Sequence, residues 1–259
     1  MRVLVTRPES EARRWVEDLR RRGFDAQALP LIEIAPAAGE AALAAAWQQL
    51  DRYTAVMFVS VNAVRHFFGL RPEGASWPLH TRAWSPGAGT RSALLAAGVD
   101  TGQVDAPPRE ALQSDSETLW EQVASQVVAG DRVLIVRGAD AQGVSSGRDW
   151  LAEQLAAAGA QVEILVAYRR QPPQLSQDQL AQAKQSGASE GCVWLFSSSQ
   201  AIEHLKGLLP GQDWSQARAV ATHPRIAQAA RRAGFGVVCE SRPALDAVAA
   251  ALVSCSTGI

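Results

Sequence analysis

Lysine is nearly missing from this chain of 259 residues, in which only Lys184 and Lys206 occur and arginine carries the remaining positive charge. The formal net charge is −1, whereas proteins that bind nucleic acid over a broad surface usually contain a strongly basic domain. We therefore expect no nucleic-acid partner. The planar arginine side chain suits carboxylates and phosphates, so its dominance is compatible with an anionic ligand, although compositional bias explains it as well.

Cysteine is also scarce, and the odd number of cysteines favours a reduced compartment. The cysteines and histidines show no metal-ligand spacing among themselves or with one another: Cys192, Cys239, Cys255, His66, His80, His204 and His223. We therefore expect no metal site.

The chain lacks any long apolar run. Met1–Val5 is apolar in part, but the sequence turns polar directly afterwards, which is too early for a signal peptide. No later run is long enough to span a bilayer. The sequence thus predicts a cytoplasmic protein without a membrane partner.

Several familiar catalytic motifs are incomplete. Gly87-Ala88-Gly89 has the start of a dinucleotide fingerprint, but Ser92 replaces its third glycine. Gly138–Gly143 has the spacing of a phosphate-binding loop, but Val144 stands in place of the lysine. No Gly-x-Ser-x-Gly nucleophile elbow occurs. Hydride transfer, phosphoryl transfer and serine hydrolysis therefore lose their usual sequence support.

What the chain does contain is an alternation of β-branched runs and amphipathic stretches, typical of parallel α/β layers. The predicted strands are Arg2–Thr6, Ala26–Ile32, Ala55–Ser60, Arg132–Arg137, Gln161–Ala167, Cys192–Ser197, Ala217–Thr222 and Val237–Glu240. The clearest predicted helices are Glu9–Arg22, Ser116–Val128, Arg148–Ala158 and Arg225–Ala233. Gly23, Gly98, Gly159 and Gly234 are placed as left-handed helix ends.

Two segments mark crossings between domains. In Ile32–Gly39 the strand-like run ends in an Ala-Pro-Ala-Ala-Gly sequence. In Tyr168–Gln174 the prolines prevent a strand from continuing. The first strand–helix–strand is too small to bury a core alone, so it must join the C-terminal part. We expect domain 1 to comprise residues 1–34 and 173–259, and domain 2 residues 39–167, with connectors at about 34–39 and 168–173.

A weak internal repeat supports two similar domains. Val56–Val64 resembles Trp194–Ile202, since each is a strand that runs into a serine-containing turn and a helix start. Trp84–Thr90 likewise parallels Val220–Ile226. Two facing α/β domains are the simplest architecture with this pattern.

Polar residues follow the predicted strands, at the edge where open α/β sheets bind ligands. Arg7 follows the first strand, and Arg137 with Gly138 repeats the arrangement, the glycine allowing a close backbone approach. Ser60, Ser198 and Thr90 stand at helix starts, where free amide groups favour anions. Helix capping explains any one of these residues, whereas their recurrence favours a ligand site.

Tyr168 is placed at the end of the strand Gln161–Ala167, where it begins the second connector and faces the cleft between domains. A phenol in that position can donate a proton to a leaving group. The alternative is an interface tyrosine with a packed ring and a hydrated hydroxyl.

The ordered set Val3–Pro8, Val59–Val64, Pro86–Thr90, Leu134–Gly138, Val166–Tyr168 and Phe196–Ile202 resembles the uroporphyrinogen-III synthase family over Met1 to about Leu252. The resemblance implies two flavodoxin-like parallel-sheet domains, the first discontinuous, with a two-stranded connector and the active site between the domains. It also implies a monomeric, cofactor-free hydro-lyase of heme (porphyrin) biosynthesis.

The resemblance further implies that the substrate is hydroxymethylbilane, a linear tetrapyrrole, handed over transiently from hydroxymethylbilane synthase. Its terminal hydroxyl leaves, and the last pyrrole attacks through its substituted carbon. The resulting spiro intermediate fragments and recloses as uroporphyrinogen III, with ring D inverted and water lost.

Site residues also follow from the resemblance. Tyr168 is expected as the catalytic acid for hydroxyl departure. Residues expected to bind substrate are Arg7, Ser60, Asn62, Thr90, Arg137, Gly138, Ser197, Ser198, Thr222 and His223. Ile226 departs from the family pattern, because many relatives have threonine there, and Thr222 or His223 is expected to replace the lost contact.

Two other readings stay open at this stage. One is a non-catalytic two-domain protein that binds an anionic ligand, a class that is usually exported. The other is a nucleotide-dependent α/β enzyme, which the incomplete fingerprints weaken.

Overall fold

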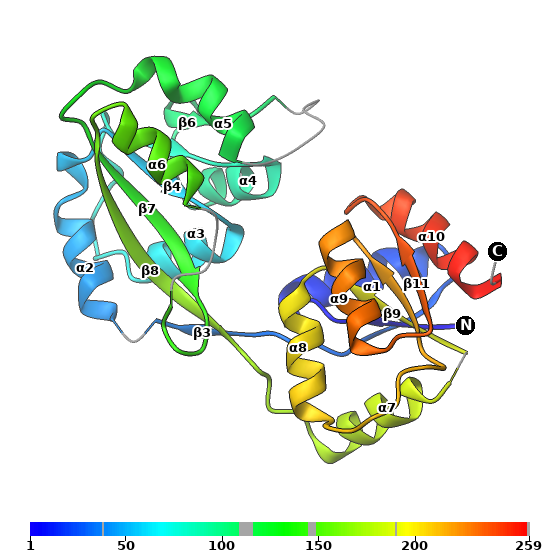
Figure 1. Cartoon of the computed structure of the whole chain (residues 1–259). Helices are drawn as coiled ribbons and strands as arrows, with labels where there is room; N and C mark the ends of the chain where they lie inside the picture. Colours follow the sequence, from blue (N-terminus) through cyan, green and yellow to red (C-terminus); the bar gives the residue numbers. More distant parts are fainter. Residues whose placement is uncertain (38, 109–115, 145–148, 190, 258–259) are drawn as a thin grey trace. The chain divides into compact units, whose positions relative to one another are not determined.

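The computed structural model of the chain describes residues 1–37, 39–108, 116–144, 149–189 and 191–257 (Figure 1). The chain divides into two compact units. Unit 1 consists of Met1–Glu33 and Gln171–Ile259, and unit 2 is the continuous segment Ile34–Arg170.

Unit 1 is built on a five-stranded parallel sheet in the order β11-β10-β9-β1-β2. Its elements are β1 (Arg2–Val5), α1 (Glu9–Arg21), β2 (Asp25–Ala28), α7 (Gln177–Gly187), β9 (Cys192–Phe196), α8 (Ser199–Leu208), β10 (Arg218–Ala221), α9 (Pro224–Ala233), β11 (Val237–Glu240) and α10 (Leu245–Thr257). Strand β1 is therefore an interior strand, paired on both sides, although it opens the chain.

Helices cover both faces of this sheet. Val3, Val193 and neighbouring strand residues form one core with the apolar faces of α1 and α10. Trp194 and Phe196 point to the opposite face, where their rings meet Trp214 and Phe235. Because parallel strands alternate between faces and crossovers are right-handed, the winding reverses between β1 and β9.

Unit 2 contains a six-stranded sheet in the order β3-β8-β7-β4-β5-β6. Its elements are β3 (Glu33–Pro36), α2 (Glu40–Gln48), β4 (Ala55–Phe58), α3 (Val61–Gly69), β5 (Arg82–Trp84), α4 (Ala88–Ala96), β6 (Val104–Asp105), α5 (Ser116–Val123), β7 (Arg132–Ala139), α6 (Trp150–Ala157) and β8 (Gln161–Gln171). Strands β4 to β8 pair in parallel.

Alternate residues of the unit 2 strands point to opposite faces of the sheet and belong to two separate cores. Val56 and Phe58 pack with α2, α3 and α4, whereas Ala55 and Met57 pack with α5 and α6 on the other face. The winding therefore reverses between β4 and β7.

The two sheets share one order. Unit 1 runs β2-β1-β9-β10-β11 and unit 2 contains β8-β7-β4-β5-β6, so β4 corresponds to β9 and β5 to β10. The repeated segments Val56–Val64 and Trp194–Ile202 thus occupy equivalent places, as do Trp84–Thr90 and Val220–Ile226. Unit 2 is a permuted version of the same winding, entered at a different strand.

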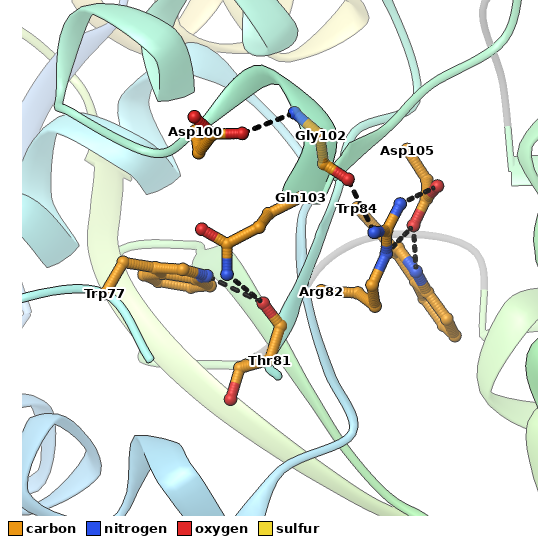
Figure 2. Close-up of polar contacts among 8 residues, drawn as sticks. All are labelled: Trp77, Thr81, Arg82, Trp84, Asp100, Gly102, Gln103 and Asp105. Carbon is orange, nitrogen blue, oxygen red and sulfur yellow. Dashed lines mark hydrogen bonds and ion pairs between the residues drawn. The ribbon is translucent and has the colours of Figure 1, made fainter. Parts of the chain in front are cut away.

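A polar network holds the β5–β6 edge of unit 2, as Figure 2 shows. The Arg82 guanidinium donates two hydrogen bonds to the Asp105 carboxylate, at 2.8 and 2.5 Å, and a third to the Gly102 carbonyl oxygen. The Trp84 indole donates to the same carboxylate at 3.1 Å. These contacts replace the ladder hydrogen bonds that two-residue β6 is too short to provide.

The coarse prediction of an α/β fold with parallel sheets is confirmed. Glycines 23, 98, 159 and 234 all have φ between 85° and 99°, as expected of helix ends. Helix α9 begins at Pro224, one residue before its predicted start, and the predicted helix Ser116–Val128 ends at Val123 with a 3-10 turn after it. The predicted start of α6, Arg148, lies outside the described residues.

Two predictions about strands were wrong. Strand β8 continues through Tyr168 to Gln171, because the prolines that end it begin only at Pro172. The segment Ile32–Gly39 contains strand β3, which tolerates Pro36 because it lies at the sheet edge and needs no second ladder.

Candidate functional site

The carboxyl ends of β4 and β7 meet where the winding of unit 2 reverses, the usual ligand position in such sheets. Ser60 follows β4 and caps α3: its hydroxyl oxygen accepts a hydrogen bond from the Ala63 amide at 3.2 Å. The same hydroxyl lies 3.0 Å from the phenol oxygen of Tyr168. Capping and contact with Tyr168 are therefore simultaneous functions of one side chain.

Tyr168 lies inside β8 and not at its end, which corrects the sequence prediction. Only 4% of its surface is exposed, and its ring belongs to the core formed with α2, α3 and α4. The imidazole of His66 stacks on the ring, with centroids 5.7 Å apart and planes inclined by 24°. Tyr168 is thus a packed, hydrogen-bonded phenol.

The sequence raises His66 only as a possible metal ligand and does not predict its contact with Tyr168. Burial, and to a smaller extent the charge of Arg65, lowers the pKa of His66 below its usual value. The imidazole beside the phenol is therefore neutral at neutral pH. The signal that the sequence offered was its place on the helix that Ser60 begins.

Arg137 and Gly138 lie within β7 and not after it, which corrects their predicted position. Arg137 is 4% exposed, and its guanidinium donates to the Asp149 carboxylate at 2.7 Å. Gly138 is the register partner of Tyr168, and the phenol ring occupies the space above it. Asp149 was not identified from the sequence, because no local pattern links it to Arg137.

Asn62 and Thr90 lie in the first turns of α3 and α4. Asn62 is half-buried, whereas Thr90 is 6% exposed and belongs to the buried side of its helix. The Ser85 hydroxyl donates to the Gly87 carbonyl at 2.7 Å and so shapes the turn before α4. These helix starts present amide groups at the same sheet edge as Ser60.

Unit 1 offers an equivalent edge between β1 and β9. Arg7 follows β1, with its guanidinium 4.5 Å above the Trp15 ring and one nitrogen 3.2 Å from the Glu11 carboxylate. Burial lowers the pKa of Arg7, which Glu11 partly offsets. Among the described residues, no hydrogen-bond partner is found for its buried Nε.

Ser197 and Ser198 follow β9, and the Ser198 hydroxyl caps α8 by accepting from the Gln200 amide at 3.2 Å. Ser197 is half-buried beside it. The neighbouring strand β1 is tied to this turn, because the Thr6 hydroxyl donates to the Leu195 carbonyl at 2.8 Å. Arg7 and the two serines therefore share one sheet edge.

Thr222 and His223 follow β10, the next strand along this edge. Thr222 is 6% exposed and its amide donates to the Phe196 carbonyl. Nδ1 of His223 caps α9 by accepting from the Arg225 amide at 3.1 Å. Ile226 is a buried residue of α9, two residues beyond the end of the Thr222–His223 turn and its following proline.

Both edges share one chemical character. Helix starts supply free amide groups and hydroxyls that bind anions, and Tyr168 adds a proton donor at the unit 2 edge. No cluster of three or more metal-ligating side chains is found in the part of the chain that the structure describes. Within the same residues, no helix is long and apolar enough to cross a membrane.

Comparison with known proteins gives one consistent result. The family model described as uroporphyrinogen-III synthase HemD matches residues 13–250. A uroporphyrinogen-III synthase of Salmonella typhimurium is 28% identical, over 91% of this chain and 92% of that protein.

Two solved structures share the fold. Uroporphyrinogen-III synthetase of Helicobacter pylori superimposes with a TM-score of 0.60 at 15% identity, covering 98% of this chain and 99% of the other. A mutant uroporphyrinogen III synthase of Thermus thermophilus gives 0.55 at 14% identity, covering 100% and 99%.

Proposed function

Because this chain belongs to the uroporphyrinogen-III synthase family, we propose that it closes hydroxymethylbilane to uroporphyrinogen III, with inversion of ring D and loss of water. The observation that carries the proposal is the family match over residues 13–250. The enzyme is a hydro-lyase of tetrapyrrole (heme) biosynthesis, and no cofactor enters the proposed reaction. The rival readings, a non-catalytic binding protein and a nucleotide-dependent enzyme, are set aside on the same match.

Tyr168 is the proposed catalytic acid. Its phenol gives a proton to the terminal hydroxyl of the substrate, which leaves as water. The lone pair of the pyrrole nitrogen assists this departure, and an electrophilic azafulvene forms. The proton that is lost when the ring finally closes restores the phenol, so one turnover leaves the acid unchanged. Since the pyrrole nitrogen already drives departure, the acid supplies only part of the barrier reduction.

Ser60 orients that acid in our proposal. Its oxygen already accepts from the Ala63 amide, so its own proton is available to the phenol oxygen 3.0 Å away. With Ser60 as the donor, the phenol proton is directed to the substrate. The positive end of α3 also stabilises charge that develops on the phenol oxygen.

The remaining site residues are proposed to bind the acetate and propionate carboxylates. At the unit 1 edge these are Arg7, Ser197, Ser198, Thr222 and His223. Their support is the partnerless Arg7 Nε and the helix starts of α8 and α9.

At the unit 2 edge, Asn62, Thr90 and Arg137 complete the proposed set. Asn62 and Thr90 are supported by their places in the first turns of α3 and α4. Arg137 has weaker support, because Asp149 already engages its guanidinium.

We further propose that the two units are flavodoxin-like domains, the first discontinuous, linked by a two-stranded connector. The sheet of unit 1 has the flavodoxin strand order 2-1-3-4-5, and five strands of unit 2 have the same winding with their order along the chain permuted. The chain passes between units near Glu33 and Arg170, at the ends of the neighbouring strands β3 and β8. A cytoplasmic monomer that receives substrate from hydroxymethylbilane synthase completes the proposal, and the free thiols of all three cysteines agree with a reduced compartment.

The test is to incubate the purified, chelator-dialysed protein with freshly made hydroxymethylbilane and to identify the uroporphyrinogen isomer formed. Type III isomer in excess of the uncatalysed type I product supports the proposal. Only type I product, or activity restored solely by an added metal or nucleotide, contradicts it. A mock purification from the same host without this protein serves as the control for contaminating host enzyme.

A further inference from the structure

The hydrogen bond between Tyr168 and Ser60 spans an intervening strand. Tyr168 belongs to β8 and Ser60 follows β4, and β7 lies between these strands in the sheet. Adjacent strands are about 4.8 Å apart, so the two backbones are separated by roughly 10 Å. The phenol reaches Ser60 only because its ring lies across β7.

Gly138 is the residue of β7 over which the ring lies. An added Cβ at Gly138 would come within 2.5 Å of Cζ, 2.6 Å of Cε2 and 2.9 Å of the hydroxyl oxygen of Tyr168. Real Cβ atoms do not tolerate such distances, and the ring is confined on another side by His66. Any side chain at position 138 would therefore displace the phenol.

The backbone does not itself require a glycine at this position. The described glycines with positive φ are Gly23, Gly74, Gly98, Gly130, Gly143, Gly159, Gly211 and Gly234. Gly138 is not among them and continues the strand β7. Its missing side chain therefore provides space and not conformational freedom.

A register shift brings the glycine and the phenol together. Arg137 pairs with Val166, but Gly138 pairs with Tyr168, so Ala167 is the extra residue of a β-bulge in β8. In regular register Gly138 would face Ala167. Bulges often redirect a side chain next to an active site. This bulge places Tyr168 opposite Gly138, and glycine is the only residue type without a Cβ.

We infer that Gly138 is a positioning residue that holds the Tyr168 phenol against Ser60, and does not contact the substrate itself. The inference rests on the proposed function of Tyr168 as the acid. It gives Gly138 an indirect role in place of the substrate contact that the family resemblance implies. The competing explanation is that the glycine merely completes core packing under a structural tyrosine.

The first test observes the phenol without any assay of activity. The chain has two tyrosines, so protein labelled with ¹³Cζ-tyrosine gives two resonances, which Tyr53→Phe assigns. Gly138→Ala should move the Tyr168 resonance and leave that of Tyr53 in place. Gly69→Ala is the matched control, because Gly69 lies on α3 with nothing within 4 Å of an added Cβ and without a positive φ; it should move neither.

The second test is a double-mutant cycle on turnover to the type III isomer. Gly138→Ala should lower kcat roughly tenfold or more in the wild-type background. With Tyr168→Phe already present, the same change should alter kcat by less than about twofold, because no phenol remains to misplace. Equal losses in both backgrounds, or an unmoved Tyr168 resonance, would overturn the inference.

Two outcomes need separate controls. If the wild-type protein forms no type III isomer, the proposed function fails, while the resonance test still decides whether Gly138 positions the phenol. If Gly138→Ala does not fold, Tyr168→Leu is added to remove the ring that the new methyl group meets. Restored folding supports the clash with Tyr168, and a double variant that stays unfolded contradicts it.

Discussion

At the scale of single residues, the proposed acid and its surroundings form a chain of three contacts. Gly138 leaves room, Ser60 bonds the hydroxyl and His66 covers the ring. Gly138 belongs to β7, whereas Ser60 and His66 belong to α3 and its cap, and each contact fixes a different freedom of the phenol. If the phenol were displaced, its hydroxyl would lose the hydrogen bond to Ser60.

Tyr168→Phe keeps the ring and its packing but removes the hydroxyl. We expect turnover to the type III isomer to fall by up to about two powers of ten. The free energy of unfolding should change by no more than about 1 kcal/mol, since one hydrogen bond is lost. Turnover and thermal unfolding are measured on both proteins. Undiminished turnover would refute the acid role, and a large loss of Tm would indicate a structural one.

Arg7 and Arg137 should respond differently to replacement by alanine. Among the described residues Arg7 Nε has no hydrogen-bond partner, so Arg7→Ala should raise KM several-fold with a smaller effect on kcat. Arg137 is buried and paired with Asp149, so Arg137→Ala should chiefly cost stability, about 1–3 kcal/mol. Kinetics and chemical denaturation separate the two effects. An unchanged KM in Arg7→Ala would exclude that side chain from substrate binding.

Tyr53, the other tyrosine, makes stability depend on alkaline pH. Burial, followed by its 2.7 Å hydrogen bond to Glu163, raises the pKa of Tyr53 to about 12. The unfolded value is about 10. Because the folded pKa is the higher one, the stabilisation is complete below about pH 10 and is lost as the pH rises through about 12. Tm measured across this range should fall more steeply in wild type than in Tyr53→Phe, and parallel curves would contradict the assignment.

How much of the site the sequence predicts depends on the range of its contacts. Ser60 and Ser198 were recognised because a capping serine, its strand and its helix are contiguous. The pairs Tyr168–His66 and Arg137–Asp149 depend on register and packing between separate elements. The bulge that aligns Gly138 with Tyr168 has no sequence signal at all, since it adds only Ala167.

At the scale of elements, the strands that the sequence does not predict are short or interrupted by proline, so they show no recognisable hydrophobic pattern. β5 and β6 contain three and two residues, which is too short for any alternation to show. β3 was concealed by Pro36, which an edge strand tolerates. The long central strands, buried on both faces, were found because their apolar runs are continuous.

Helix α9 provides a test of capping against substrate binding. His223→Ala removes the acceptor for the Arg225 amide and should cost about 1 kcal/mol of stability. His223→Asn supplies another capping oxygen and should largely restore the wild-type Tm. A KM raised in both variants would place the imidazole at the substrate. A KM raised in neither, with stability lost only in the alanine variant, would leave His223 a cap alone.

At the scale of the whole molecule, three apolar cores of the described residues each draw on one unit. The core around Val3 and Val193 draws only on unit 1, and those around Phe58 and Met57 only on unit 2. The sequence predicts a discontinuous first domain, because its first strand–helix–strand cannot bury a core alone. The permuted winding of unit 2 could not be anticipated, since strand order depends on long-range pairing.

Separate cores predict separate folding. The segment Ile34–Arg170 contains all residues of both unit 2 cores, so expressed alone it should unfold cooperatively and give dispersed amide resonances.

The segment Gln171–Ile259 is the matched control. It lacks β1 and β2, which continue the sheet beyond β9, and α1, which covers one face, so it should not fold by itself. Adding a Met1–Glu33 peptide should restore its structure by returning these two strands and the helix. A molten Ile34–Arg170 segment would show instead that unit 2 needs unit 1, and a folded Gln171–Ile259 segment would show that unit 1 can dispense with β1, α1 and β2.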